Sequence, residues 1–204
     1  MAIQRRNHPG LRTFQGRIPR TPIESDLMAK NNKSAKSKSP RLSTQTDLSG
    51  NAVPEIAEAL NGLLADAFAL YLKTKNFHWH VSGPHFRDYH LLFDEQAAEI
   101  YASTDVLAER VRKLGARTIH SVAEISRRQS IKDNDKDFVR PADMLKELME
   151  DNKTIIRAMR KTHDIAGQRE DVATTSILEN FIDEAEKRNW FLFEASRKGD
   201  GSGH

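Results

Sequence analysis

Apolar residues recur every three or four positions along four long stretches of the chain, which is the spacing of an amphipathic α-helix. The first helix is predicted to begin near Asn51, a residue that can cap it, and to run to about residue 80. Three further helices are predicted at about 85–114, 141–167 and 172–196.

A long connection separates the second and third predicted helices, over residues 116–139. It contains a stretch of helical character at 121–129, followed by the polar sequence KDNDKD. No strand-like alternation and no internal repeat stands out. The pattern therefore predicts an all-α fold: a ferritin-like four-helix bundle with a short helix in the long crossover between helices two and three.

Charge is distributed unevenly along the 204 residues. Residues 1–41 carry ten Lys and Arg against two acidic residues, whereas residues 42–204 carry 22 against 27. Residues 1–50 also hold few apolar side chains, so we expect a disordered basic N-terminal arm before a bundle domain at 51–197 and a flexible tail at 198–204. The basic arm is either a solubilising tail or a segment that binds DNA non-specifically by neutralising phosphates.

The chain contains no cysteine, which excludes disulfides, thiolate metal sites and cysteine nucleophiles. No apolar run approaches about 18 residues, so no membrane span is expected. Four of the eight histidines lie in NFHWHVSGPHFRDYHLLFDEQ, residues 76–96. Histidine and carboxylate ligands favour iron, manganese or zinc. The Glu-x-x-His pairs of intrabundle di-iron sites do not occur in the sequence, which argues against a site of that type.

The second predicted helix separates its apolar residues from its candidate metal ligands. Its apolar stripe consists of Phe93, Ala97, Ile100, Thr104, Leu107, Val111 and Leu114. At about 100° per residue, His90, Asp94, Asp105 and Glu109 share an arc of roughly 100° that is centred about 115° away from this stripe. We therefore expect these four side chains to point away from the core of their own bundle.

The spacing of these ligands suggests a site shared by two chains. Asp94 and Asp105 lie roughly 16 Å apart along the helix axis, too far for both to bind one ion. Two antiparallel copies of the helix that cross near residues 99 and 100 would place His90 and Asp94 of one chain opposite Glu109 and Asp105 of the other. The alternative is a solvated helix face, on which Asp105 or Glu109 pairs with neighbouring Arg or Lys residues.

The residue order resembles that of the Dps family, the DNA-binding proteins from starved cells, which are miniferritins. The resemblance covers about residues 51–197 and rests on KTKNFHWHVSGPHFRDYHLLFDEQ, STDVLAERVRKLG, IHSVAEI and DEAEKRNWFLFEA. It implies an intersubunit di-iron-type ferroxidase site, with ligands His78, His90 and Asp94 from one chain and Asp105 and Glu109 from its twofold neighbour.

Membership of this family implies a hollow homo-dodecamer in the cytoplasm, associated with the nucleoid. Such a cage oxidises Fe(II), typically with hydrogen peroxide, stores the ferric product as mineral and protects DNA from oxidative damage during stress. The alternative is a DNA-condensing nucleoid protein whose iron chemistry is secondary. A catalase-like or rubrerythrin-like di-iron enzyme is disfavoured by the missing Glu-x-x-His pairs.

Several other residues have two interpretations. Trp79 either donates an electron to a stray oxidising species or packs at an interface. An acidic face at the start of the third long helix either lines an iron pore, as in the family, or faces solvent near the helix dipole; it consists of Asp143, Glu147, Glu150 and Asp151. No matching role is assigned to His80, His85, His120 and His163.

Overall fold

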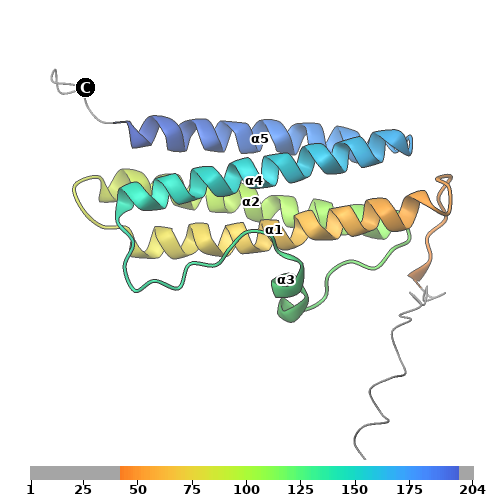
Figure 1. Ribbon diagram of the computed structural model, residues 1–204, viewed down its shortest axis with the longest axis horizontal. Coiled ribbons are helices and arrows are strands. Elements are labelled where there is room, and N and C mark those ends of the chain that lie inside the picture. Colours follow the sequence, from red (N-terminus) through yellow and green to blue (C-terminus); the bar gives the residue numbers. More distant parts are fainter. Residues whose placement is uncertain (1–41, 198–204) are drawn as a thin grey trace, which may run out of the picture. The chain divides into compact units, whose positions relative to one another are not determined.

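The computed structural model describes residues 42–197, and the residues of the predicted arm before position 42 lie outside this range together with the predicted tail. Four long helices are present: α1 (Ala52–His80), α2 (Phe86–Lys113), α4 (Pro141–Gln168) and α5 (Val172–Ser196). They lie side by side, with α1 packed mainly on α2 and α4 on α5 (Figure 1). The prediction of an all-α four-helix bundle is confirmed.

The crossover between α2 and α4 carries the short helix α3 (Val122–Arg128), which lies against α1 (Figure 1). Two buried polar residues of α1 hold the crossover in place. Asn61 donates to the carbonyl of Arg117 and accepts from the amide of Ile119, and the Asp66 carboxylate accepts from both backbone and hydroxyl of Ser130. The connection thus follows α1 because α1 satisfies its backbone groups.

The apolar stripe predicted for the second helix forms part of the core. Its seven residues are all at most 5% exposed. Phe93 and Leu107 are completely buried, and they pack with Phe77 of α1 and Leu148 of α4 in one hydrophobic cluster. Burying this stripe turns the opposite face of α2, which carries the predicted ligands, away from the core.

The first helix begins at Ala52, directly after Asn51, in agreement with the predicted start near Asn51. Asn51 occupies the N-cap position, as predicted, but its side chain makes no capping hydrogen bond. Instead, the amide of Ala52 donates to the carbonyl of Ser49 at 3.0 Å. A backbone turn thus satisfies the first amide of the helix.

Residues 42–50, which the sequence assigns to the arm, contact the end of α2. Arg112 donates to the carbonyl of Leu42 at 2.9 Å, and the Thr44 hydroxyl donates to the carbonyl of Arg112 at 3.1 Å. Gly115 adopts φ +78°, and a Cβ at this position would lie 2.9 Å from the backbone nitrogen and oxygen of Thr44. Within residues 42–197, no helix is long and apolar enough to cross a membrane.

Candidate metal centre

A pair of histidines joins the end of α1 to the start of α2. The turn between these helices contains Gly83 at φ +107°, a conformation that glycine adopts without strain, and reverses the chain. His78 Nδ1 lies 2.8 Å from the carbonyl oxygen of His90, and His90 Nδ1 lies 2.9 Å from that of His78. The two rings stack with centroids 3.8 Å apart and an angle of 22° between their planes.

These reciprocal hydrogen bonds determine which ring nitrogen carries the proton. A carbonyl oxygen only accepts, so Nδ1 of each ring must be the donor. In the neutral imidazole, Nε2 then carries the free lone pair. Metal-binding histidines commonly use this arrangement, in which one nitrogen donates to a carbonyl and the other binds the ion. His78 and His90 therefore have the ring orientation and the hydrogen bonding of metal-binding histidines.

Asp94 lies one turn after His90 on α2. Its Oδ1 is 3.9 Å from His78 Nε2 and 2.6 Å from Lys75 Nζ. The hydrogen bond from Lys75, together with the positive charge of this lysine, holds the pKa of Asp94 below its usual value. The carboxylate is thus ionised at neutral pH, and its side chain is 54% exposed.

The other two predicted ligands lie farther along α2. Asp105 and Glu109 are exposed, and Glu109 pairs with Lys113 at 3.1 Å. Within residues 42–197 of a single chain, no three His, Asp or Glu side chains are grouped so that they could hold an ion. The structure thus brings His78 close to His90 and Asp94 but leaves Asp105 and Glu109 apart from them.

The face of α2 that carries these carboxylates also exposes apolar residues. Leu91 and Tyr101 are 41% and 55% exposed, and Ala98 and Ala102 lie beside them on the same face. The neighbouring face of α1 exposes Leu72 and Trp79, one heptad apart, at 58% and 57%. These six residues and the carboxylates Asp94, Asp105 and Glu109 together form the α1–α2 face. An exposed apolar surface of this kind is typical of a contact with another protein surface.

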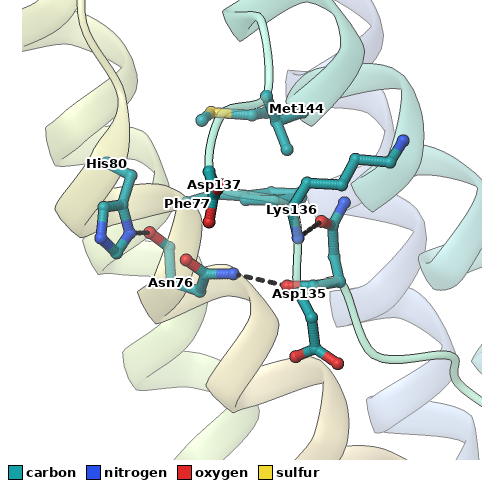
Figure 2. A pocket seen from close by; sticks show the side chains of 9 residues that line it. Asn76, Phe77, His80, Asp135, Lys136, Asp137 and Met144 are labelled. Atoms are coloured by element: carbon teal, nitrogen blue, oxygen red, sulfur yellow. Dashed lines mark hydrogen bonds between the residues drawn. The ribbon is translucent and has the colours of Figure 1, made fainter. Parts of the chain in front are cut away.

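His80 belongs to a different part of the molecule. Figure 2 shows its Nδ1 donating to the carbonyl of Asn76 in a pocket of about 400 Å³, between the end of α1 and residues 134–139. The Asn76 side chain donates to the carbonyl of Asn134 in the same pocket. His78 does not line this pocket, so His78 and His80 lie in different environments.

The three remaining histidines without a predicted role make local contacts. His120 lies 3.1 Å from Glu124, His163 lies 3.2 Å from Glu179, and the ring of His85 lies near that of Tyr89.

The four acidic residues of the predicted pore face all have basic partners within the chain. Asp143 pairs with Arg140 and Glu150 with Lys153 on the surface. Glu147 and Asp151 both contact the buried ammonium of Lys73, at 3.2 and 2.7 Å. Burial raises the pKa of Asp151 even though Lys73 acts to lower it. A pore role for these residues stays a prediction.

Lys75 was missed at the sequence level. It precedes His78 by three residues, a spacing that places both side chains on one side of α1. Its ammonium also lies 5.8 Å from the centre of the Trp79 ring, within the range of a cation–π contact.

Comparison with known proteins gives the class of this protein. Residues 57–199 match the family model described as a ferritin-like domain. The chain is 32% identical over 137 residues to the DNA protection during starvation protein of Brevibacillus brevis, covering 67% of this chain and 91% of that protein. It is 29% identical over 137 residues to DNA protection during starvation protein 1 of Deinococcus radiodurans, covering 67% and 66% respectively.

Solved structures agree with this result. Dps from Thermosynechococcus elongatus superposes with a TM-score of 0.71 and 30% identity, covering 74% of this chain and 96% of that one. Dps from Vibrio cholerae O1, described as a member of a broad superfamily of ferritin-like diiron-carboxylate proteins, gives 0.72 and 27%, covering 76% and 98%. The chain is a ferritin-like all-α protein. Within that class it belongs to the Dps family.

Proposed function

We propose that this chain is a Dps-type ferroxidase and iron-storage protein that protects DNA, and that each oxidation centre is shared by two twofold-related chains. The observation that carries the proposal is the stacked pair of His78 and His90, whose Nδ1 atoms bond to backbone carbonyls and leave Nε2 for an ion, beside the carboxylate of Asp94. Iron is the substrate, and His78, His90 and Asp94 supply one side of its binding site.

The α1–α2 face supports a second chain as the source of the remaining ligands. In an antiparallel pair of α2 helices that cross near residues 99 and 100, Ala98 lies opposite Tyr101 of the other chain. The apolar residues then meet at the twofold axis, and the carboxylates lie on both sides of it. Asp94 comes opposite Asp105, and His90 comes opposite Glu109. One interface would thus bury the exposed apolar residues and complete two identical centres.

The ligand set suits the reaction. Imidazole and carboxylate bind iron, and carboxylates stabilise Fe(III) more than Fe(II), which favours oxidation. Two Fe(II) ions each give one electron to hydrogen peroxide, which takes up two protons and leaves as two water molecules. This reaction consumes both reactants that form hydroxyl radicals, so it would protect nearby DNA. The proposed assembly is a homo-dodecamer that stores the ferric product in its interior.

The first test measures Fe(II) oxidation by absorbance, with hydrogen peroxide and then with O₂. Replacing both His90 and Asp94 by Ala is expected to abolish fast oxidation. A matched control replaces His163 and Glu179, a histidine–carboxylate pair between α4 and α5, by Ala. This control should leave the rate of Fe(II) oxidation unchanged. An unchanged rate in the first double variant would show that the site is wrongly assigned.

A mixing experiment tests the sharing of ligands between chains. One variant lacks His90 and Asp94, and a second carries Asp105→Asn and Glu109→Gln. Each should be inactive alone. When the two are unfolded and refolded together, half of the dimers are mixed and each has one intact centre, so about a quarter of the parent activity should return. A site built within one chain would give no recovery.

DNA binding is proposed for the basic residues 1–41. A dodecamer presents twelve such arms, so weak contacts with phosphates would combine into strong, salt-dependent binding. A gel-shift comparison of the full chain with a chain that begins at residue 42 tests this and keeps the contacts of residues 42–50 with α2. Equal binding at low salt would refute the role of the arm. DNA binding without peroxide-dependent iron oxidation would favour a DNA-condensing protein.

A further inference from the structure

Lys75 makes the shortest contact to the proposed centre, and this contact suggests a role in controlling metal affinity. We propose that Lys75 is a displaceable positioning residue: its ammonium holds the Asp94 carboxylate in the metal-free protein and must leave it before a divalent cation binds. Lys75 therefore sets the affinity of the centre. This inference rests on the proposed function, because it requires that Asp94 is a ligand.

The distances show why the ammonium and the metal compete. Lys75 Nζ lies 2.6 Å from Asp94 Oδ1, and the same oxygen lies 3.9 Å from His78 Nε2. Two ligand atoms that each bind one ion at about 2.0–2.2 Å are at most about 4.4 Å apart. One ion can therefore reach both atoms almost without rearrangement. An ammonium already bonded to Oδ1 occupies a lone pair of that oxygen and repels the incoming dication.

The surroundings of Lys75 allow its ammonium to move away. In the single chain the Asp94 side chain is 54% exposed, so the ammonium of Lys75 lies outside the hydrophobic core. It also lies 5.8 Å from the Trp79 ring, and the face of an aromatic ring attracts a cation. The Trp79 ring therefore offers the displaced ammonium a partner within the same chain.

The lysine beside Glu109 is bound differently. Lys113 and Glu109 form an (i, i+4) pair in which both side chains are about 60% exposed, and such pairs are weak. Lys75 is only 18% exposed and connects α1 to α2. We therefore assign the competing role to Lys75 and use a surface lysine as the control.

The test is a Co(II) titration of the assembled protein, followed by visible absorbance, which reports metal binding without iron oxidation. Lys75→Met keeps the aliphatic stem but removes the charge, and it should bind Co(II) about fivefold more tightly than the parent. Lys75→Arg restores a cation and should stay within about twofold of the parent. The control Lys153→Met removes a surface partner of Glu150 and should have no effect. Circular dichroism and sedimentation confirm that each variant folds and assembles.

Two further outcomes separate this inference from the proposed function. If Asp94→Asn abolishes Co(II) binding but Lys75→Met binds no more tightly than the parent, the role of Lys75 is wrong and the centre stands. If Asp94→Asn binds Co(II) as the parent does, both the centre and the role of Lys75 are wrong. Equal tightening by Lys75→Arg and Lys75→Met would also overturn the inference, because charge would then not be the cause.

Discussion

Asp171 links the α4–α5 turn to α2, and its removal should destabilise the bundle strongly. Its side chain accepts hydrogen bonds from the amide and hydroxyl of Thr174, at 3.0 and 2.5 Å, and thereby caps α5. It also accepts from Arg110 Nη2 at 2.5 Å, and Arg110 Nε donates to the Thr174 hydroxyl at 2.8 Å. Asp171 is only 2% exposed. Because Arg110 directly follows Glu109, this anchor also fixes the turn of α2 that carries half of the proposed centre.

The expected cost of Asp171→Ala follows from these contacts. Losing a helix cap costs about 1 kcal/mol. Removing one partner of a buried ion pair costs about 3–5 kcal/mol, and the lower end applies because the Arg110 side chain is 14% exposed. The free energy of unfolding should therefore fall by roughly 3–4 kcal/mol. For a domain of this size, each kcal/mol lowers Tm by about 2–4 °C, so a decrease of about 10 °C is expected.

Thermal and urea unfolding, followed by circular dichroism at one fixed subunit concentration, would measure this loss. The matched control is Asp143→Ala, which removes another Asp–Arg pair at the start of a helix, but one exposed to solvent. It should leave Tm nearly unchanged. A double variant that also carries Arg110→Met should lose at least about 1 kcal/mol less than the sum of the two single losses, since no cation is left unpaired.

The dependence on pH gives an independent check. Burial acts to raise the pKa of Asp171, but the hydrogen bonds from Arg110 and Thr174 outweigh it and hold the pKa below its usual value. The stability that Asp171 provides is therefore fully present above about pH 4 and is lost as the pH falls through the lower folded-state pKa. The difference between parent and Asp171→Ala should narrow below pH 4. A loss no larger than that of Asp143→Ala, or an additive double variant, would refute the reasoning.

Two further changes test the fold around α1 and α2. Lys73→Met removes a buried cation between two carboxylates and should destabilise the protein more at pH 8 than at pH 5. The half-buried Asp151 already has a raised pKa, so its protonation at lower pH relieves the repulsion between the two carboxylates. Urea unfolding at both pH values measures this difference, and the opposite trend would contradict the reasoning. Gly115→Ala places a Cβ against Thr44 and should speed amide exchange over residues 42–50, whereas Gly83→Ala, also at positive φ but with open space around it, should not.

Hydrophobic periodicity was enough to predict the helices and the orientation of α2. The stripe from Phe93 to Leu114 has a single helical phase, so its burial determines that Asp94 and Glu109 point outward. Lys75 could not be found in this way. Its partner lies on another helix across a tight turn, and the phase of one helix contains no information about how a second helix faces it. The rings of His78 and His90 are likewise held by backbone carbonyls. Every residue has a carbonyl, so the sequence does not indicate which ones accept these hydrogen bonds.

The same limit explains the contacts of residues 42–50. Their composition gives little apolar area to bury, which favours disorder. In the structure, the Arg112 side chain donates to the backbone carbonyl of Leu42, and the missing side chain of Gly115 leaves space for the backbone of Thr44. Asn51 occupies the predicted N-cap position, but the hydrogen bond at the start of α1 comes from the backbone, where the carbonyl of Ser49 accepts from the first helical amide.

Lys73 and Lys75 show how the same residue type can serve two purposes on one helix. Lys73 is 4% exposed and lies between Glu147 and Asp151, so moving its ammonium would leave two carboxylates facing each other without a cation. Lys75 faces the single carboxylate of Asp94, which is half exposed and which a metal ion can neutralise in its place. Displacing Lys73 would break this ionic contact between α1 and α4, whereas displacing Lys75 exchanges one cation for another. Only the second exchange is compatible with reversible metal binding in a folded bundle.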